Sequence, residues 1–193
     1  MKNDIIVAGV GGQGILSIAA AIGLAAVNSN LYIKQSEVHG MSQRGGDVQS
    51  HFRISDKPIA SDLIPAGKAD MIISVEPMEG LRYLPFLAPT GWLVTNVTPF
   101  NNIPDYPNID DILSEIKAVK NHIAIDADAI AKEAGSTKAS NIVMLGAASL
   151  FLDIPFERIE EGIRQLFGKK GNDVIQLNLK ALRLGREFSK KNR

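Results

Sequence analysis

The chain has 193 residues with 21 basic and 21 acidic side chains, a hydrophobic share of 45% and no cysteine. A formal net charge of zero argues against an electrostatic nucleic-acid interface and against a polybasic membrane anchor. The absence of cysteine excludes disulfides, thiolate zinc sites and cysteine-ligated iron–sulfur clusters. If the protein serves redox chemistry, we therefore expect another chain to carry the metal.

The length predicts one domain spanning residues 1–193, since no linker, repeat or low-complexity segment divides the chain. The longest mostly apolar run, 15–27, is shorter than the ~20 residues that a membrane span needs. The first apolar segment begins close to the initiator Met, which leaves no room for a signal peptide. We therefore expect a cytoplasmic protein that binds neither membranes nor nucleic acid.

Short apolar runs, typical of strands buried on both faces of a parallel sheet, alternate with helical patterns along the first two thirds of the chain. Such strands are expected at residues 4–8, 31–35, 70–75, 91–97 and 122–125. The run 47–55 alternates polar and apolar residues, which favours a strand with one solvated face, as in antiparallel pairs. Helices are expected at 13–29, 77–87, 109–119 and 126–135, a short turn or helix at 61–68 and a loop at 98–107.

Two expected helices begin with residues that are favoured at helix starts, and the helix at 13–29 has almost no polar face. Pro77 suits the first position of a helix, and Asp126 suits an N-cap. The helix at 13–29 is Ala-rich and apolar nearly all round. We expect it to lie between the sheet and a second layer, such as a partner subunit.

The last third of the chain changes character, because helical spacing continues and no strand pattern is present. Helices are expected at 139–152, 156–167 and 173–190, and a frayed, solvated end at 189–193. Strands that alternate with helices, followed by a helical tail, predict an α/β fold. The expected architecture is a Rossmann-like, doubly wound, mostly parallel sheet with a helical C-terminal tail.

A glycine-rich turn directly follows the first expected strand and opens a helix. The spacing Gly9-x-Gly11-x-x-Gly14 presents backbone N–H groups and the positive end of a helix to an anion. The alternatives are that the glycines only allow close packing of helix on strand, or that the turn faces a partner chain. Gly12 and Gln13 place a bulky amide where a phosphate must approach, which neither supports nor excludes a nucleotide.

A second polar segment runs Glu37-Val-His-Gly-Met-Ser-Gln-Arg-Gly-Gly46. Gly costs about 0.5–1 kcal/mol relative to Ala inside a helix or strand, so we expect a loop, and one that meets the glycine turn in space. Glu37 lies at the distance where dinucleotide-binding folds place a ribose-binding acid. The rest of the segment contradicts a nicotinamide site, because ordinary helix normally follows such an acid.

The candidate cofactor-binding residues all come from these two segments. They are Gly9, Gly11, Gly12, Gln13, Gly14, Glu37, His39, Ser42, Gln43, Arg44, Gly45 and Gly46. Arg44 either binds a phosphate or carboxylate with its planar fork of donors or pairs with Glu37 to order the loop. His39 has no second ligand at helical spacing, so we expect a hydrogen-bonded loop histidine and no metal site.

Three further polar residues have plain structural readings. His51 lies on the polar face of its strand, where contact with solvent is expected. Glu76 and Glu79 flank the start of the helix at 77 and are expected to be first-turn charges rather than a catalytic carboxylate pair.

Four motifs, in this order, resemble the gamma subunits or domains of the 2-oxoacid ferredoxin oxidoreductases, and in particular the beta subunits of the indolepyruvate enzymes. They are Gly-Val-Gly-Gly-Gln-Gly14, the polar segment 37–46, Ser50-His-Phe-Arg-Ile-Ser55 and Glu76-Pro-Met-Glu-Gly-Leu-Arg-Tyr-Leu84. The match covers nearly the whole chain, and the order Gln-Arg-Gly-Gly is more specific than the glycine turn.

The resemblance implies an enzyme in which a 2-oxoacid loses CO₂ on thiamine diphosphate, electrons pass through iron–sulfur clusters to ferredoxin, and the acyl group leaves on coenzyme A. A larger alpha subunit is then expected to carry the thiamine diphosphate, the Mg²⁺ ion and the clusters. The chain itself has no cysteine and no Gly-Asp-Gly motif of the kind that holds thiamine diphosphate. We therefore expect one subunit of a hetero-oligomer, with no catalytic residue of its own.

Other functions remain open at this stage. The chain could be a gamma subunit for pyruvate or 2-oxoglutarate, a free-standing dinucleotide-binding reductase, or a non-catalytic scaffold on a Rossmann-like fold. The reductase would bind its dinucleotide without a partner. The scaffold would bind a larger subunit and leave turnover unchanged when omitted.

Overall fold

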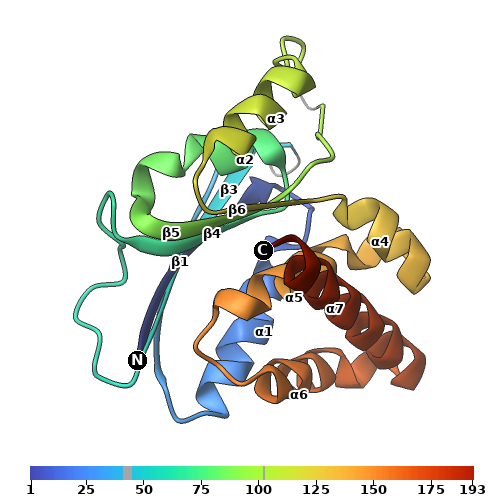
Figure 1. Cartoon of the computed structure of the whole chain (residues 1–193). Helices are drawn as coiled ribbons and strands as arrows, with labels where there is room; N and C mark the ends of the chain where they lie inside the picture. Colours follow the sequence, from blue (N-terminus) through green and yellow to red (C-terminus); the bar gives the residue numbers. More distant parts are fainter. Residues whose placement is uncertain (41–44, 102) are drawn as a thin grey trace.

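The computed structural model describes residues 1–40, 45–101 and 103–193. Within this described part, six strands form one sheet in the order β2-β3-β1-β4-β5-β6, with helices on both faces (Figure 1). The strands are β1 Lys2–Val10, β2 Tyr32–His39, β3 Asp47–Ser55, β4 Ala69–Ser74, β5 Leu87–Asn96 and β6 His122–Ile125. The α-helices are α1 Ile15–Val27, α2 Pro77–Arg82, α3 Ile109–Ala118, α4 Ala127–Ala134, α5 Ser140–Ala148, α6 Phe156–Phe167 and α7 Asn172–Asn192. Short 3₁₀ turns are η1 Leu84–Phe86, η2 Thr137–Ala139, η3 Ser149–Phe151 and η4 Gly168–Lys170.

The pairing of the strands confirms the expected mostly parallel α/β sheet. β1 pairs in parallel with β4, β4 with β5 and β5 with β6. β3 runs antiparallel to both of its neighbours, β1 and β2, as its alternating pattern predicted. β1 is therefore central, and Ile5, Ile6 and Val7 are fully buried.

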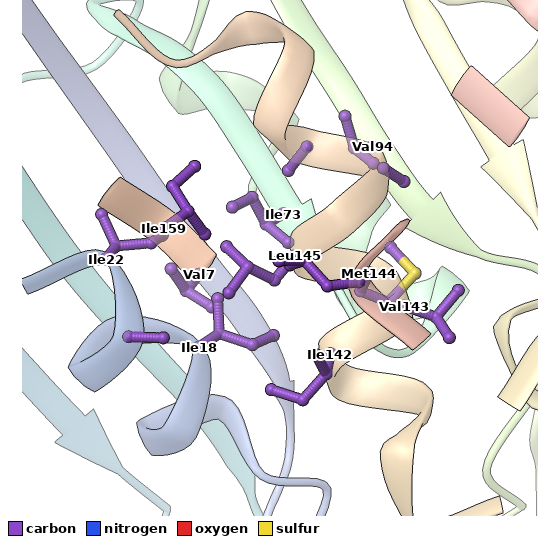
Figure 2. Packing of buried hydrophobic residues seen from close by; sticks show 14 of the residues in the cluster. Val7, Ile18, Ile22, Ile73, Val94, Ile142, Val143, Met144, Leu145 and Ile159 are labelled. Carbon is purple, nitrogen blue, oxygen red and sulfur yellow. The ribbon is translucent and has the colours of Figure 1, made fainter. Parts of the chain in front are cut away.

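Helices cover the two faces of the sheet unequally. α2 and α3 lie on one face, and α1 with α4 to α7 lies on the other (Figure 1). Figure 2 shows the larger core, where side chains of β1, β4 and β5 meet those of α1, α5 and α6. The residues labelled there are Val7, Ile18, Ile22, Ile73, Val94, Ile142, Val143, Met144, Leu145 and Ile159. The helical tail thus supplies a large part of this larger core.

Another helix of this chain, α6, supplies a second layer over α1. α6 packs directly on α1, with Gly162 so close to the backbone oxygen of Ala21 that a Cβ would collide with it. Leu16 and Val27, at the two ends of α1, remain 53% and 59% exposed. Sequence periodicity alone could not say which layer would cover this helix.

Several boundaries differ from the sequence-based expectation. β2 extends to His39 because its backbone pairs with β3 as far as His39↔Val48, so the expected loop begins only at Gly40. The helix expected at 77–87 ends at Arg82 and continues as η1, where Pro85 cannot donate a backbone hydrogen bond. β5 starts at Leu87 rather than at residue 91, and α7 stays helical to Asn192, with Ser189 fully buried instead of frayed.

No helix within the described residues combines the length and the apolar character that crossing a bilayer requires.

Candidate functional site

The glycine turn joins β1 to α1 and is closed by its own glutamine. Gly12 and Gly14 have φ angles of +98° and +80°, a region that favours glycine. The Oε1 atom of Gln13 accepts the N–H of Val10 at 2.8 Å, and the N–H of Gln13 donates to the Val10 carbonyl at 3.1 Å. The bulky amide therefore fixes the turn and does not block its outer surface.

The glycines of this turn have different surroundings. A Cβ on Gly9 would collide with Val75 of the neighbouring strand end, and one on Gly14 would collide with Asn141 of α5. The side chain of Asn141 donates to the Gly14 carbonyl at 3.1 Å. A Cβ on Gly12 would meet no described atom within 4 Å. Close packing therefore explains Gly9 and Gly14, whereas Gly12 is open to a ligand.

The expected meeting of the two polar segments is present. The N–H of Gly11 donates to the Gly46 carbonyl at 2.9 Å, and the N–H of Gly40 donates to the Asp47 carbonyl at 2.8 Å. Gly45, in the same connection, has a φ of +83°. These contacts bring Gly11 and Gly46 together at the carboxyl end of β1.

Glu37 and His39 lie apart from the glycine turn. Both belong to β2, where the His39 ring contacts the Glu37 carboxylate and the Gln35 amide donates to Glu37 at 3.2 Å. Antiparallel β3 separates β2 from β1, so two strand spacings, about 10 Å, lie between Glu37 and the strand that leads into the turn. A ribose bound at the turn would not contact Glu37, so the chain lacks the ribose-binding acid that a nicotinamide site would need at this position.

Three of the predicted binding residues, Ser42, Gln43 and Arg44, lie outside the described residues, as does any pairing between Arg44 and Glu37.

A cavity of about 630 Å³ opens beside the glycine turn. Its walls are the turn, the start of α1, the η2–α5 segment and the junction of α6 with α7. Lys138 and Lys170 line it, with Asp173 the single acid among the described lining residues. The first turns of α1, α5 and α7 also border it, and helix N-termini favour anions. The charges and helix ends together suit a phosphorylated ligand.

A second cavity, of about 320 Å³, continues from the first, because Gln13 and Ser140 line both. It lies over the carboxyl ends of β4 and β5 and includes Asn96, Thr98 and Phe100. Its lining is mostly amide, hydroxyl and apolar, and Phe100 is 43% exposed. We call the two cavities together the carboxyl-edge groove.

The groove lies where the fold class places ligands. β1 leads into α1 on one face of the sheet, and β4 leads into α2 on the other face (Figure 1). Open α/β sheets bind ligands outside the carboxyl ends of the strands at such a reversal. Gln13 and Val75, which follow β1 and β4, both line the second cavity.

The two acids at the start of α2 are buried. Glu76 is the N-cap and is fully buried, and its carboxylate accepts the N–H of Glu79 at 2.9 Å. Glu79 is 2% exposed and pairs with Arg82 at 2.8 Å, and burial raises the pKa of the Glu79 carboxyl. Both acids therefore lie in the first turn as expected, but inside the protein rather than in solvent.

The expectation of a solvated His51 is wrong. The side chain is 6% exposed, its Nδ1 accepts the N–H of Ile64 at 3.0 Å, and its ring packs edge-on against Phe86. Burial lowers the pKa of His51. The polar side of β3 is covered because the segment 56–68 folds back over it, a long-range contact that strand alternation does not reveal.

The sequence of the chain is similar to a known family along nearly its whole length. A family model described as pyruvate ferredoxin/flavodoxin oxidoreductase matches residues 4–188. The chain belongs to this family. It is 39% identical to the indolepyruvate oxidoreductase subunit IorB of Archaeoglobus fulgidus, over 96% of this chain and 94% of that protein. The IorB subunit of Pyrococcus horikoshii is 36% identical over 98% of this chain and 96% of its own length.

Solved structures show the same fold. A 2-oxoglutarate:ferredoxin oxidoreductase from Magnetococcus marinus, with 2-oxoglutarate, coenzyme A and succinyl-CoA bound, matches with a TM-score of 0.78 and 24% identity. The match covers 98% of this chain but 31% of that one, so this chain spans about a third of its length. The pyruvate oxidoreductase subunit PORC from Thermotoga maritima matches with a TM-score of 0.73 and 22% identity, over 96% of both chains.

In this member of the pyruvate ferredoxin/flavodoxin oxidoreductase family, the sequence motifs predicted the side of the groove formed by the glycine turn. They did not predict the side formed by the helical tail. Lys138, Lys170 and Asn178 come from the helical tail, in which no binding residue was predicted. Two short clusters hold the lysines between helices, Gly135-Ser-Thr-Lys138 and Gly168-Lys-Lys-Gly171, and these could have served as a signal. Among the described residues no group of three or more His, Asp or Glu side chains could hold a metal ion.

Proposed function

We propose that this chain is the beta subunit of an indolepyruvate-type 2-oxoacid ferredoxin oxidoreductase, a single gamma-type domain over residues 1–193. Nearly full-length similarity to subunits named IorB supports this assignment. A 2-oxoglutarate synthase subunit KorC is only 27% identical, which favours an arylpyruvate over 2-oxoglutarate as the substrate. The larger subunit supplies decarboxylation on thiamine diphosphate with Mg²⁺ and electron transfer through iron–sulfur clusters to ferredoxin.

The contribution of this chain is a binding surface for coenzyme A, and the carboxyl-edge groove is the observation that carries it. Coenzyme A has phosphates at one end and an uncharged arm with two amides and a thiol at the other. The groove has Lys138, Lys170 and open Gly12 at one end. At the other end amide, hydroxyl and apolar groups line it, with Asp128 the one acid among the described lining residues. We assign the phosphates to the first cavity and the arm to the second. The thiol end of the arm then extends past Phe100 toward the larger subunit.

The test is reconstitution of the hetero-oligomer. The isolated chain should be colourless and should not reduce a dye with arylpyruvate, because it has no cysteine to hold clusters. The two subunits, expressed together, should elute as one complex and reduce ferredoxin in a reaction that needs both arylpyruvate and coenzyme A. Separate elution, a chromophore in the isolated chain, or full activity of the larger subunit alone would contradict the proposal.

Arg44 remains a predicted contact of coenzyme A or of the substrate carboxylate. Its guanidinium donates in a planar fork that lysine cannot reproduce, so Arg44→Lys should lower turnover of the complex about tenfold. A purely structural pair with Glu37 would instead cost about 0–1 kcal/mol of stability and leave turnover nearly unchanged. Steady-state rates against both substrates, measured with the melting temperature, separate these outcomes.

The partners follow from the same proposal: a larger alpha subunit bound directly, ferredoxin reached through the complex, and neither nucleic acid nor a membrane. A cytoplasmic location is part of it.

A further inference from the structure

One family motif, Glu76-Pro-Met-Glu-Gly-Leu-Arg-Tyr83, forms α2 on the face of the sheet opposite the first cavity, and the coenzyme A proposal gives it no role. Side chains at its two ends reach two separate loops of the carboxyl edge. We propose that Glu76 and Tyr83 are positioning residues. Glu76 holds the first loop against the groove, and Tyr83 fixes the end of the second, at Asp47, beside the glycine turn. This inference rests on the proposed function, since it concerns the same coenzyme A groove.

The first loop joins β5 to α3, and residues 97–101 and 103–108 of it are described. Glu76 holds it at two points: the N–H of Phe100 donates to its carboxylate at 3.3 Å, and the hydroxyl of Tyr106 donates to the same oxygen. Phe100 forms part of the wall of the second cavity. Glu76 itself does not line the groove, so it acts on a ligand through the backbone of Phe100.

The second loop joins β2 to β3. The hydroxyl of Tyr83 donates to the Asp47 carboxylate at 3.0 Å, and Tyr83 is 6% exposed. The backbone oxygen of Asp47 accepts from Gly40, and the neighbouring Gly46 accepts from Gly11 of the glycine turn. Tyr83 therefore fixes the end of the connection that rests on the turn.

Glu76 is buried, so its carboxylate does not serve to keep the protein surface soluble and must be stabilised inside the protein. Its side chain is fully buried, and no Lys, Arg or His of the described chain forms an ion pair with it. A buried carboxylate without a cation is costly unless several donors satisfy it. The donors are the backbone N–H groups of Glu79 and Phe100 and the Tyr106 hydroxyl. Two of these three belong to the loop, so the carboxylate and the loop stabilise each other.

The tyrosines of the chain provide the test. Tyr106→Phe and Tyr83→Phe each remove one hydroxyl that joins α2 to a loop and keep the ring. Tyr32→Phe is the matched control, because Tyr32 is 51% exposed at the start of β2, away from the carboxyl edge. Each variant is measured in the assembled enzyme for kcat, for KM with coenzyme A and with arylpyruvate, and for hydrogen exchange of the backbone.

We expect Tyr106→Phe and Tyr83→Phe to raise KM for coenzyme A at least about fivefold, because a hydrogen bond to a carboxylate is lost from each loop. KM for arylpyruvate should stay within about twofold, and Tyr32→Phe should match the wild type. Hydrogen exchange should accelerate in 97–108 for Tyr106→Phe only and around Asp47 for Tyr83→Phe only. A variant that merely unfolds would instead lower kcat for both substrates and speed exchange throughout.

Unchanged KM for coenzyme A in both variants, with a working wild-type complex, would overturn the positioning role and leave the subunit assignment intact. A wild-type complex without coenzyme A dependence would overturn the proposed function itself. The two failures are therefore distinguishable in the same set of measurements.

Discussion

Gly12 and Gly14 lie two residues apart in one turn and share a positive φ, but a side chain would meet different surroundings at each. Gly14→Ala should lower the free energy of unfolding by more than Gly12→Ala. Both changes carry the ~1–2 kcal/mol cost of a left-handed residue, and Gly14→Ala adds a collision with Asn141. Urea unfolding of the two variants measures the difference, and equal losses would show that the contact with α5 is not tight.

The same pair separates packing from binding at this turn. Gly12→Ala points its new methyl group into open space beside the first cavity, so it should weaken coenzyme A binding by the assembled enzyme more than its small loss of stability suggests.

His51 should make the stability of the protein depend on pH. Burial lowers its pKa in the folded state, with a smaller raising effect from Asp62 and a lowering effect from Arg53. The unfolded chain therefore binds a proton first, so stability is complete above the unfolded pKa of about 6.5 and falls as the pH drops below it toward the folded value. In His51→Asn, the amide oxygen can still accept the N–H of Ile64 without titrating. Unfolding free energies between about pH 7.5 and 5 should fall less steeply in the variant, and equal slopes would contradict this account.

At the residue scale, the sequence predicted the glycine turn and its partner loop but not the lysines opposite them. The turn is local, since a strand, three glycines and a helix follow one another along the chain. Lys138 and Lys170 reach the groove only because α5 and α6, their neighbours in the chain, fold back beside α1, and no pattern in the sequence encodes that return.

At the scale of elements, the crossing of α5 and α7 sets the geometry of the helical layer. A Cβ on Gly146 would overlap the backbone oxygen of Leu182, and one on Gly185 would overlap that of Val143, so the two backbones are nearly in contact. Gly185→Ala should force the helices apart and lower the unfolding free energy by roughly 1–3 kcal/mol, despite the better helix propensity of Ala.

Gly168→Ala is the control for this crossing. Gly168 has an ordinary helical φ of −54°, and a Cβ there would meet no described atom within 4 Å. Its substitution should change the unfolding free energy by no more than about 0.5 kcal/mol. Similar losses at both positions would mean that the crossing is not the source of the effect.

Elements could be predicted from the sequence where side-chain pattern determines their extent. They were predicted less well where backbone pairing with a neighbouring strand determines it. The strands expected at 4–8, 70–75 and 122–125 are present as β1, β4 and β6. Pro77 takes the first position of α2 and Asp126 the N-cap of α4, as expected. Residues 37–39 read as loop because they open a polar, glycine-rich segment, but pairing with β3 holds them as strand at the sheet edge. Composition therefore says little about how far an edge strand extends.

At the scale of the whole molecule, half of the large apolar side chains that are exposed among the described residues lie at the edge that carries the groove. Leu16, Val38, Phe100 and Ile103 are each at least 43% exposed and follow or end β1, β2 and β5 at their carboxyl ends. In the proposed complex this edge faces the larger subunit. Leu16→Lys should therefore weaken association of the subunits at least about tenfold, measured by titration of one subunit against the other.

Val27→Lys is the control, since Val27 is exposed to a similar extent at the opposite end of α1. It should leave association and stability unchanged within error. Equal weakening by both variants would place the contact along the whole of α1, and no weakening by either would move it away from this helix.

The order of the elements along the chain has a consequence for synthesis on the ribosome. Every strand of the sheet lies before residue 126, whereas α5 and α6, which cover Val7, Ile73 and Val94, come after residue 139. A nascent chain that has released only its strands holds a sheet with α2 and α3 on one face and α1 alone on the other, where apolar side chains of β4 and β5 await α5. The helical tail therefore covers this face of the sheet last. A ribosome that stalls before α5 leaves an aggregation-prone intermediate with exposed apolar surface, which chaperones must bind.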